Sequence, residues 1–185
     1  MTTHRILVSG FGGQGVMGIG QLLTYAGMFE GKEVSWLPSY GPEMRGGAAN
    51  CSVILSDEPV GAPNISKAQN VIVMNEPSLD KFESYVEEGG NLFINSTLVS
   101  RDTTRTDINS YMLPVNKLTE EYGNARALNM IMVGAFNEVA KVVTDESVSA
   151  AVKELYGKKR PELLEMNLNA VKFGAEKIKE IINGK

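Results

Sequence analysis

The stretch that decides the fold is residues 5–15, RILVSGFGGQG. Residues 5–9 are a short, mostly apolar run, typical of a buried parallel strand, and the glycine pattern Gly-x-Gly-x-x-Gly follows at once over residues 10–15. Apolar residues then recur at helical spacing over about 15–31, and residues 33–37 form a second strand-like run. We therefore predict a β-loop-α-β unit, which favours an α/β sheet.

The segment after this unit, residues 38–50, has two prolines and no apolar periodicity, so we predict a loop of about 13 residues. No helix fits there, and the third strand, residues 51–56, is expected to run antiparallel to the second. Further strands are predicted at 70–75, at 91–95 after a turn at Gly89-Gly90, and at 111–115, with a short helix at 79–86.

The carboxy-terminal third is predicted to be helical, over about 125–143, 145–156 and 161–182. Residues 128–136 are apolar nearly all round, so this helix should be buried on several sides, either centrally or under a partner. The last helix carries one apolar stripe, expected to cover the sheet rather than a partner subunit: Leu164, Leu168, Val171, Ala175, Ile178 and Ile182. The chain is thus predicted to be a single three-layer, Rossmann-like α/β domain over 1–185 with a mostly parallel sheet, sheet-forming to about 115 and helical from about 116.

The amino-acid composition argues against several kinds of binding site and partner. Of 19 glycines in 185 residues, 12 lie in residues 1–61, so bare backbone is needed there. One cysteine and one histidine argue against disulfides, metal sites, iron–sulfur clusters held by this chain alone, and histidine relays. A net charge of −4 with dispersed basic residues disfavours nucleic acid as a partner. The sequence has no run of 18 apolar residues, so we predict no membrane-spanning helix. We expect a cytoplasmic protein.

The glycine loop offers backbone N–H groups and a helix amino terminus to an anion through Gly12, Gly13, Gln14 and Gly15. Dinucleotide binding requires an acidic residue at the end of the second strand, whereas this strand ends Trp36-Leu37-Pro38. Another anion, a backbone contact, or a tight turn without any ligand remain open. No Gly-Lys-Ser/Thr follows, so a Walker-type phosphate loop is excluded.

The loop after the second strand should rise over the same sheet edge as the glycine loop, where ligands bind in open α/β sheets. Arg45 offers a fork for phosphate or carboxylate, Glu43 could pair with it or accept from a ligand, and Tyr40 could stack or donate. The alternative is a solvated loop stiffened by prolines. The candidate contact residues here are Tyr40, Glu43, Arg45, Gly46, Gly47, Asn50, Asn75 and Glu76.

The sequence shows no pattern of residues typical of a catalytic site. Cys51 opens the third strand, where a small buried hydrophobe is the simpler interpretation than a reactive thiol. We assign no catalytic residue and no metal ligand to this chain.

Five segments, in this order and spacing, resemble the gamma subunit of 2-oxoacid:ferredoxin oxidoreductases over about residues 6–136. They are FGGQG (11–15), SYGPEMRGGAANCSV (39–53), NVIVMNEPSLDKF (70–82), GGNLFIN (89–95) and ALNMIMVGAF (127–136). The resemblance implies a complex that converts a 2-oxoacid to acyl-CoA and carbon dioxide and reduces ferredoxin. It implies thiamine diphosphate, magnesium, iron–sulfur clusters and coenzyme A in the complex, with none held by this chain alone.

The resemblance also implies partners: alpha and beta subunits and, in some complexes, a ferredoxin-like delta subunit. The gamma subunit would serve assembly and contact coenzyme A, whose phosphates could meet Gly12, Gly13 and Arg45, and it would be inactive alone. The loop around Arg45 favours 2-oxoglutarate or a branched-chain 2-oxoacid over pyruvate. An apolar face built for partners would let the isolated chain form a homodimer. The alternatives are an independent NAD(P)-binding dehydrogenase and a non-enzymatic anion-binding scaffold.

Overall fold

The computed structural model describes residues 2–41, 47–158 and 160–184. Six strands form one sheet in the order β2-β3-β1-β4-β5-β6. Their bounds are β1 Thr3–Phe11, β2 Glu33–Tyr40, β3 Ala48–Ser56, β4 Ala68–Val73, β5 Val86–Asn95 and β6 Asn109–Leu113. Strands β1, β4, β5 and β6 pair in parallel, while β3 is antiparallel to both β1 and β2. The predicted mostly parallel α/β sheet and the antiparallel third strand are confirmed.

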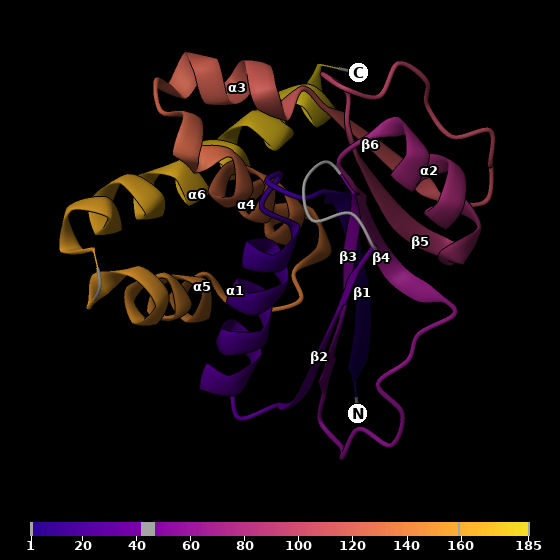
Figure 1. Ribbon diagram of the computed structural model, residues 1–185, viewed down its shortest axis with the longest axis horizontal. Helices are drawn as coiled ribbons and strands as arrows, with labels where there is room; N and C mark the ends of the chain where they lie inside the picture. The colour runs from indigo at the N-terminus through magenta and orange to yellow at the C-terminus, as the bar shows by residue number, and fades with distance from the viewer. Residues whose placement is uncertain (1, 42–46, 159, 185) are drawn as a thin grey trace.

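Helices cover the two faces unequally (Figure 1). On one face lie α1 (Val16–Phe29) and α4 (Leu128–Ala140), with α5 (Asp145–Val152) packed against α1 and α6 (Leu164–Asn183) packed against α4. The other face carries α2 (Glu76–Phe82) and the turn η1 (Glu83–Tyr85). Helix α3 (Val115–Tyr122) and the short turns η2 (Ala125–Ala127), η3 (Lys153–Gly157) and η4 (Pro161–Leu163) complete the chain.

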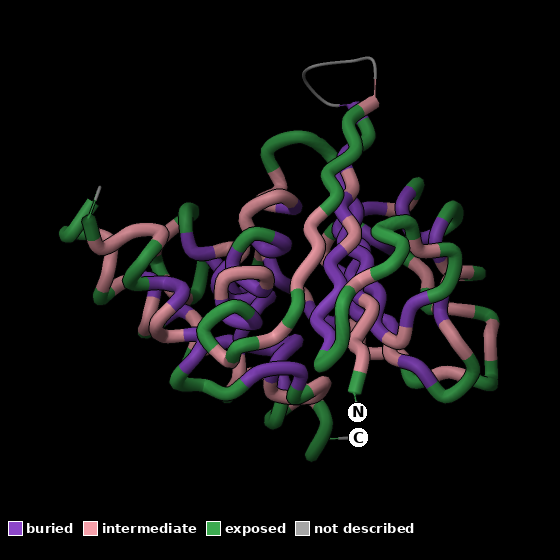
Figure 2. Tube along the Cα trace, turned by 90° about the horizontal axis from the view of Figure 1, so that it is seen from below, coloured by how far each residue is buried: buried purple, intermediate pink, exposed green. Residues whose placement is uncertain are grey.

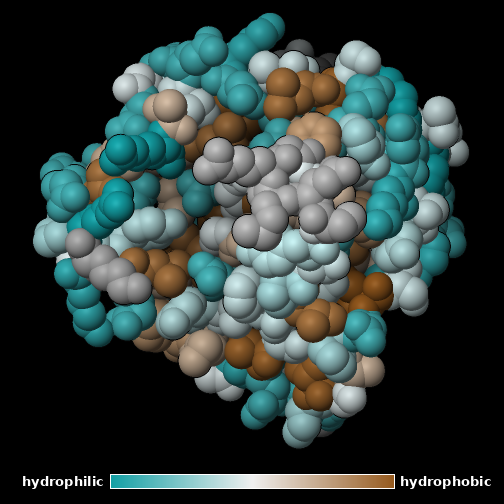
Figure 3. Space-filling view, in the orientation of Figure 1, coloured by the Kyte–Doolittle hydropathy of each residue, from teal (hydrophilic) through white to brown (hydrophobic). Residues whose placement is uncertain are grey.

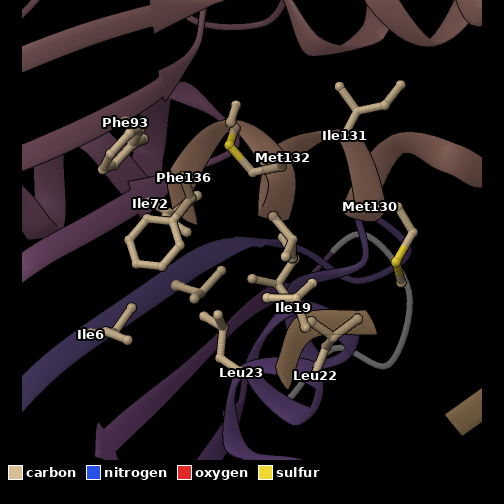
Figure 4. Close-up of a cluster of buried hydrophobic side chains, with 14 of the residues drawn as sticks. Ile6, Ile19, Leu22, Leu23, Ile72, Phe93, Met130, Ile131, Met132 and Phe136 are labelled. Carbon is tan, nitrogen blue, oxygen red and sulfur yellow. The ribbon is translucent and has the colours of Figure 1, made fainter. Parts of the chain in front are cut away.

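Alternation along the strands builds two cores. Ile6 and Val8 of β1 point toward α1 and α4, and Leu7 between them points toward α2. The larger core gathers α1, α4 and the sheet around Phe136, whose ring meets that of Phe93 edge to face at 5.2 Å (Figure 4). All residues of α4 from Met130 to Asn137 are buried, so the predicted helix buried on several sides is central.

The last helix corrects one prediction. Helix α6 packs on α4 rather than on the sheet, and its buried row is Asn167, Ala170, Gly174 and Ile178, of which only Ile178 belongs to the predicted stripe. The reason is a close crossing: Gly174 approaches the backbone of Ile131, and Gly134 approaches that of Val171. Small residues let the helix axes approach, so they occupy the line of closest contact, while Leu164, Leu168 and Val171 are only partly buried against the larger core.

The predicted loop over residues 38–50 is also corrected. Strands β2 and β3 continue as a paired arm, with Pro38 opposite Cys51 and Tyr40 opposite Ala49. Pro38 is tolerated because β2 is an edge strand. Figure 2 shows this arm projecting beyond the buried centre of the molecule, with its outer surface largely exposed.

Two further boundaries differ from the predictions. The Gly89-Gly90 pair lies inside β5 rather than in a turn before it, where Gly89 has a φ of 74°. Helix α3 was not predicted, because its short amphipathic segment follows directly on β6 after Pro114.

None of the helices in the described residues is long and apolar enough to cross a membrane.

Candidate functional site at the carboxyl edge of the sheet

The parallel strands β1, β4 and β5 end at one edge of the sheet, called here the carboxyl edge, and the β2–β3 arm ends there as well. The glycine loop, residues 10–15, follows β1, and Asn75 follows β4. The N–H of Gly12 donates to the carbonyl of Gly47 at 3.1 Å, so the two glycine-rich segments are in direct contact. The predicted juxtaposition of the two loops is confirmed.

Several backbone N–H groups of the glycine loop already donate hydrogen bonds within the protein. The N–H of Phe11 donates to Oε1 of Gln14 at 2.6 Å, and the N–H of Gln14 donates to the carbonyl of Phe11 at 3.2 Å. Gly13 is exposed and has a φ of 94° with open space where a Cβ would be, so its backbone is open to approach. Gly15, in the left-handed conformation at a φ of 77°, forms the N-cap of α1.

Gln14 holds three segments together. Besides accepting from Phe11, its Oε1 accepts from Nδ2 of Asn75 at 3.1 Å, and its Nε2 donates to the carbonyl of Met74 at 3.2 Å. Oδ1 of Asn75 accepts from the N–H of Ser78 at 2.9 Å and thereby caps α2. Both side chains therefore shape the carboxyl edge, and in these positions their polar groups already have protein partners.

The amino terminus of α1 is covered by α4. A Cβ at Gly15 would lie 2.8 Å from Cβ of Asn129, and one at Gly18 would lie 2.9 Å from Nδ2 of the same residue. Sequence reasoning missed Asn129, because nothing in the pattern of α4 distinguishes it from an ordinary helix residue. Its position shows that Gly15 and Gly18 serve a close helix–helix contact.

The sheet order bears directly on dinucleotide binding. A dinucleotide-binding fold places the second strand beside the first, so that an acid at its end reaches the ribose. Here β3 lies between β1 and β2, and Phe11 pairs with Ala48 where that neighbouring strand end would be. The topology therefore adds a second reason against a dinucleotide to the missing strand-end acid.

The last residue of β2 is exposed at the start of the second loop. The side chain of Tyr40 is 69% exposed, and the N–H of Gly41 donates to the carbonyl of Ala48 at 2.7 Å. Asn50 is half-buried and lies in register with Ser9 on one side and Ser39 on the other. The candidate residues Glu43, Arg45 and Gly46 lie outside the described residues.

Glu76, another candidate, contacts the loop that follows β5. Its Oε2 accepts from the N–H and hydroxyl of Ser100, and its Oε1 lies 3.9 Å from Nε of Arg101. The same arginine pairs with Asp80 at 2.7 Å and with Glu83 at 3.1 Å. These contacts fasten residues 100–101 to α2 and direct the Glu76 carboxylate toward that loop.

Glu83 gives this attachment a pH dependence. Partial burial alone would raise its pKa, but hydrogen bonds from the Thr103 hydroxyl, the Thr104 N–H and Arg101 hold the pKa of Glu83 below its ordinary value. A carboxyl with a lowered folded pKa stabilises the fold fully above its unfolded pKa, about 4.3, and loses that effect as the pH falls through the folded value.

We therefore expect Glu83→Gln to lower the free energy of unfolding by about 1 kcal/mol at pH 7. The difference from the parent should shrink below about pH 4, because the parent then loses the same contribution by protonation. Urea unfolding at pH 7 and at acid pH measures this, with the exposed Glu162→Gln as control. A difference that stays constant with pH would contradict the assignment.

Cys51 is fully buried, in line with its interpretation as a small hydrophobe. Its Sγ lies 3.6 Å from the carbonyl of Val16, and burial raises the pKa of the thiol to about 12. The thiolate is the reactive form, so this cysteine is chemically protected in the native state.

We expect native protein to resist alkylation by iodoacetamide at pH 8, and urea-unfolded protein to react completely. Mass spectrometry of the intact chain measures the extent. Rapid modification of the folded protein would show that the α1–β3 contact opens readily.

Within residues 2–41, 47–158 and 160–184, no three His, Cys, Asp or Glu side chains are grouped to hold a metal ion. The polar network at the carboxyl edge instead consists of amides: Asn95, fully buried, donates to Oδ1 of Asn116 at 2.8 Å and to the carbonyl of Met74 at 3.5 Å.

Comparison with protein families matches residues 5–177 to the family described as pyruvate ferredoxin/flavodoxin oxidoreductase. The chain is 36% identical over 181 residues to ketoisovalerate oxidoreductase subunit VorA of Methanothermobacter thermautotrophicus, covering 97% of this chain but only 37% of VorA. It is 34% identical over 180 residues to 2-oxoglutarate synthase subunit KorC of Methanocaldococcus jannaschii, covering 96% of this chain and 95% of KorC.

Solved structures agree in fold. The keto/oxoacid ferredoxin oxidoreductase gamma subunit from Geobacter sulfurreducens superposes with a TM-score of 0.85 at 27% identity, covering 97% of this chain and 98% of that one. The 2-oxoglutarate:ferredoxin oxidoreductase from Magnetococcus marinus, solved with 2-oxoglutarate, coenzyme A and succinyl-CoA bound, gives a TM-score of 0.87 at 22% identity. This likeness, which is one of fold, covers 97% of this chain and 32% of that one.

Proposed function

Because the chain belongs to the pyruvate ferredoxin/flavodoxin oxidoreductase family, we propose that it is the gamma subunit of a 2-oxoacid:ferredoxin oxidoreductase. The observation that carries this proposal is the match to KorC, which covers 95% of that separate subunit at 34% identity. The complex would convert a 2-oxoacid and coenzyme A to acyl-CoA and carbon dioxide with reduction of ferredoxin. An independent dehydrogenase is disfavoured by the sheet order.

In such a complex we expect other subunits to hold the redox cofactors, and the side chains of this chain agree with that expectation. Its single cysteine is buried with a thiol pKa of about 12, so it is unsuited to ligate an iron–sulfur cluster. Thiamine diphosphate, magnesium and the iron–sulfur clusters would be held by alpha, beta and ferredoxin-like subunits. This chain contributes binding surface rather than redox chemistry, and ferredoxin is reached only indirectly.

The surface for those partners is proposed to be the carboxyl edge and the β2–β3 arm. Three large apolar side chains are exposed there: Phe11 at 36%, Leu37 at 38% and Tyr40 at 69%. Figure 3 shows hydrophobic residues in separate patches around the end of the arm rather than in one continuous face. Aromatic anchors of this kind dominate protein interfaces when a partner covers them.

Coenzyme A contact is the second part of the proposal. Since the N–H of Gly12 is used by Gly47, the exposed backbone of Gly13 is the better of the two for approaching a phosphate. Arg45, from the adjoining segment, would supply a guanidinium for the same phosphate. If so, Arg45→Ala raises the apparent KM for coenzyme A in the reconstituted complex, whereas an unchanged KM would remove this role.

Reconstitution tests the function itself. The purified chain should be colourless and inactive, and the other subunits should reduce ferredoxin with 2-oxoglutarate and coenzyme A only when this chain is added. We propose 2-oxoglutarate as substrate over branched-chain 2-oxoacids because the match covers 95% of KorC, against 37% of VorA. Activity of the isolated chain, or saturable micromolar binding of NADH or NADPH to it, would overturn the proposal. Greater activity with 3-methyl-2-oxobutanoate would overturn only the substrate.

A further inference from the structure

A cavity of about 310 Å³ lies on the helical side of the molecule, away from the β2–β3 arm. It forms where η2 and the first turn of α4 meet η3, η4 and the first turn of α6. Its lining includes Arg126, Asn129, Tyr156, Arg160, Leu163 and Asn167. Nothing in the proposed function uses this cavity.

The charged residues that line the cavity are all positive. Arg126 and Arg160 are both lining residues, and no acidic residue is. Neither arginine forms an ion pair with any acidic residue in the described ranges 2–41, 47–158 and 160–184. Two unneutralised arginines in one concave site favour an anion, and phosphate matches their planar forks.

Two other concave sites with cations also contain a carboxylate. The cavity around Arg5 also includes Glu58. The one around Lys32 and Lys141 also includes Glu30. In both, the protein supplies its own counter-charge. A third cavity, around Lys81, has no acidic residue in its lining but holds a single cation. The Arg126–Arg160 cavity differs from all three because it combines two cations with no acidic residue.

The frame of the cavity is held by hydrogen bonds. Oδ1 of Asn124 accepts from the N–H of Arg126 at 3.0 Å, which fixes the start of η2 and α4. The hydroxyl of Tyr122 donates to the carbonyl of Met166 at 2.8 Å, which ties the first turn of α6 to α3. Because η2–α4 and η4–α6 both begin here, the positive ends of two helices add to the arginine charge.

The remaining lining suits an organic group attached to the anion. Tyr156, Leu163 and Met166 provide an aromatic and apolar wall, and the amides of Asn129 and Asn167 provide directional hydrogen-bonding groups. A volume of about 310 Å³ exceeds the space that one phosphate needs and falls within the range of small-molecule sites.

We propose that this cavity binds a nucleoside phosphate, with its phosphate between Arg126 and Arg160 and its base on the side of Tyr156 and Leu163. Asn129 lines the cavity and also packs on Gly15 and Gly18, so the ligand would lie near the start of α1, which follows the glycine loop. The nucleoside phosphate is either a free nucleotide or the nucleotide portion of a larger cofactor. The site stands whether or not the proposed function holds.

Calorimetric titration of the full chain with ADP at low ionic strength tests the proposal. We expect saturable binding that Arg126→Gln and Arg160→Gln each weaken by about tenfold or more, because each removes a charge-assisted contact. Arg5→Gln is the matched control, since this arginine shares its cavity with Glu58, and it should leave binding unchanged within about twofold. Tyr156→Ala should weaken ADP but not inorganic phosphate, which itself should bind far more weakly than ADP.

Three results would overturn the proposal: no saturable ADP binding, equal loss in the Arg5→Gln control, or ADP affinity unchanged in both cavity variants. Thermal unfolding of each variant shows that a loss of binding is not a loss of folding. Competition of coenzyme A with ADP identifies the source of the nucleotide. If coenzyme A displaces ADP and binds more tightly than ADP and ATP, the ligand is the nucleotide portion of that cofactor, and if ADP or ATP binds more tightly than coenzyme A, it is a free nucleotide.

Discussion

Gly134→Ala and Gly174→Ala will each lower the free energy of unfolding by about 3 kcal/mol or more. A Cβ at Gly134 would lie 2.7 Å from the carbonyl carbon of Val171, and one at Gly174 would lie 2.8 Å from that of Ile131. The carbonyl oxygens are closer still, and both belong to helix backbone, which cannot rotate aside. The two helices must therefore separate along their length, opening gaps around buried side chains.

The sign of the change in the free energy of unfolding distinguishes an effect of packing from an effect of intrinsic helix propensity. In an unconstrained helix, alanine is more stable than glycine by about 1 kcal/mol, so propensity alone predicts that both substitutions stabilise. Gly157→Ala is the matched control, because a Cβ there meets only Cδ2 of Leu164 at 3.8 Å. Urea unfolding measures all three variants. Stabilisation by Gly134→Ala would show that the close crossing of α4 and α6 is wrong.

The double variant carries further information. Once one methyl group has separated α4 from α6, the second meets a wider gap, so the combined loss should be smaller than the sum of the two single losses. Strict additivity would mean that the two contacts are independent, contrary to their position at one crossing.

Gln14→Ala will have the next largest effect, a loss of about 2 to 3 kcal/mol in the free energy of unfolding. The substitution removes three hydrogen bonds, those with the Phe11 N–H, the Asn75 amide and the Met74 carbonyl, at about 1 kcal/mol each. Because these bonds join the ends of β1 and β4, the variant should also weaken association with the partner subunits proposed for the carboxyl edge.

Two companion variants sharpen this prediction. Gln14→Glu keeps the acceptor oxygens for Phe11 and Asn75 but cannot donate from an amide to the Met74 carbonyl, so its loss should be smaller than that of alanine. Gln21→Ala, at an exposed position of the helix that follows, should be nearly neutral. If Gln14→Ala unfolds like Gln21→Ala, the side chain of Gln14 does not hold the edge together.

Much of the fold could be predicted from local pattern. The run before Gly10, the helical spacing after Gly15 and the apolar stretch at 128–136 each depend on residues close in sequence, and each predicted element exists. The misplaced features depend on contacts far apart in the chain. The length of the β2–β3 arm depends on pairing between Pro38 and Cys51, and the buried face of α6 depends on Gly134.

The candidate site divides in the same way. Its location at the carboxyl edge could be predicted, because parallel strands that are each followed by a loop end on one side of a sheet. The side-chain partners could not, since Gln14 and Asn75 are 61 residues apart and their hydrogen bond follows from the placement of β4 beside β1. Asn129 reaches the glycine loop only because α4 packs across the start of α1.

By itself, the sequence determined most of the elements, the concentration of glycine in the first third and the unsuitability of a lone cysteine for cluster chemistry, because these are properties of residue type and spacing. Only the tertiary structure decided what the glycines are for. Gly15 and Gly18 admit Asn129, Gly20 admits Cys51, and Gly134 and Gly174 admit neighbouring backbone, so much of the bare backbone serves close packing inside the protein. The physical reason is that a missing Cβ has meaning only relative to the atom that occupies its place.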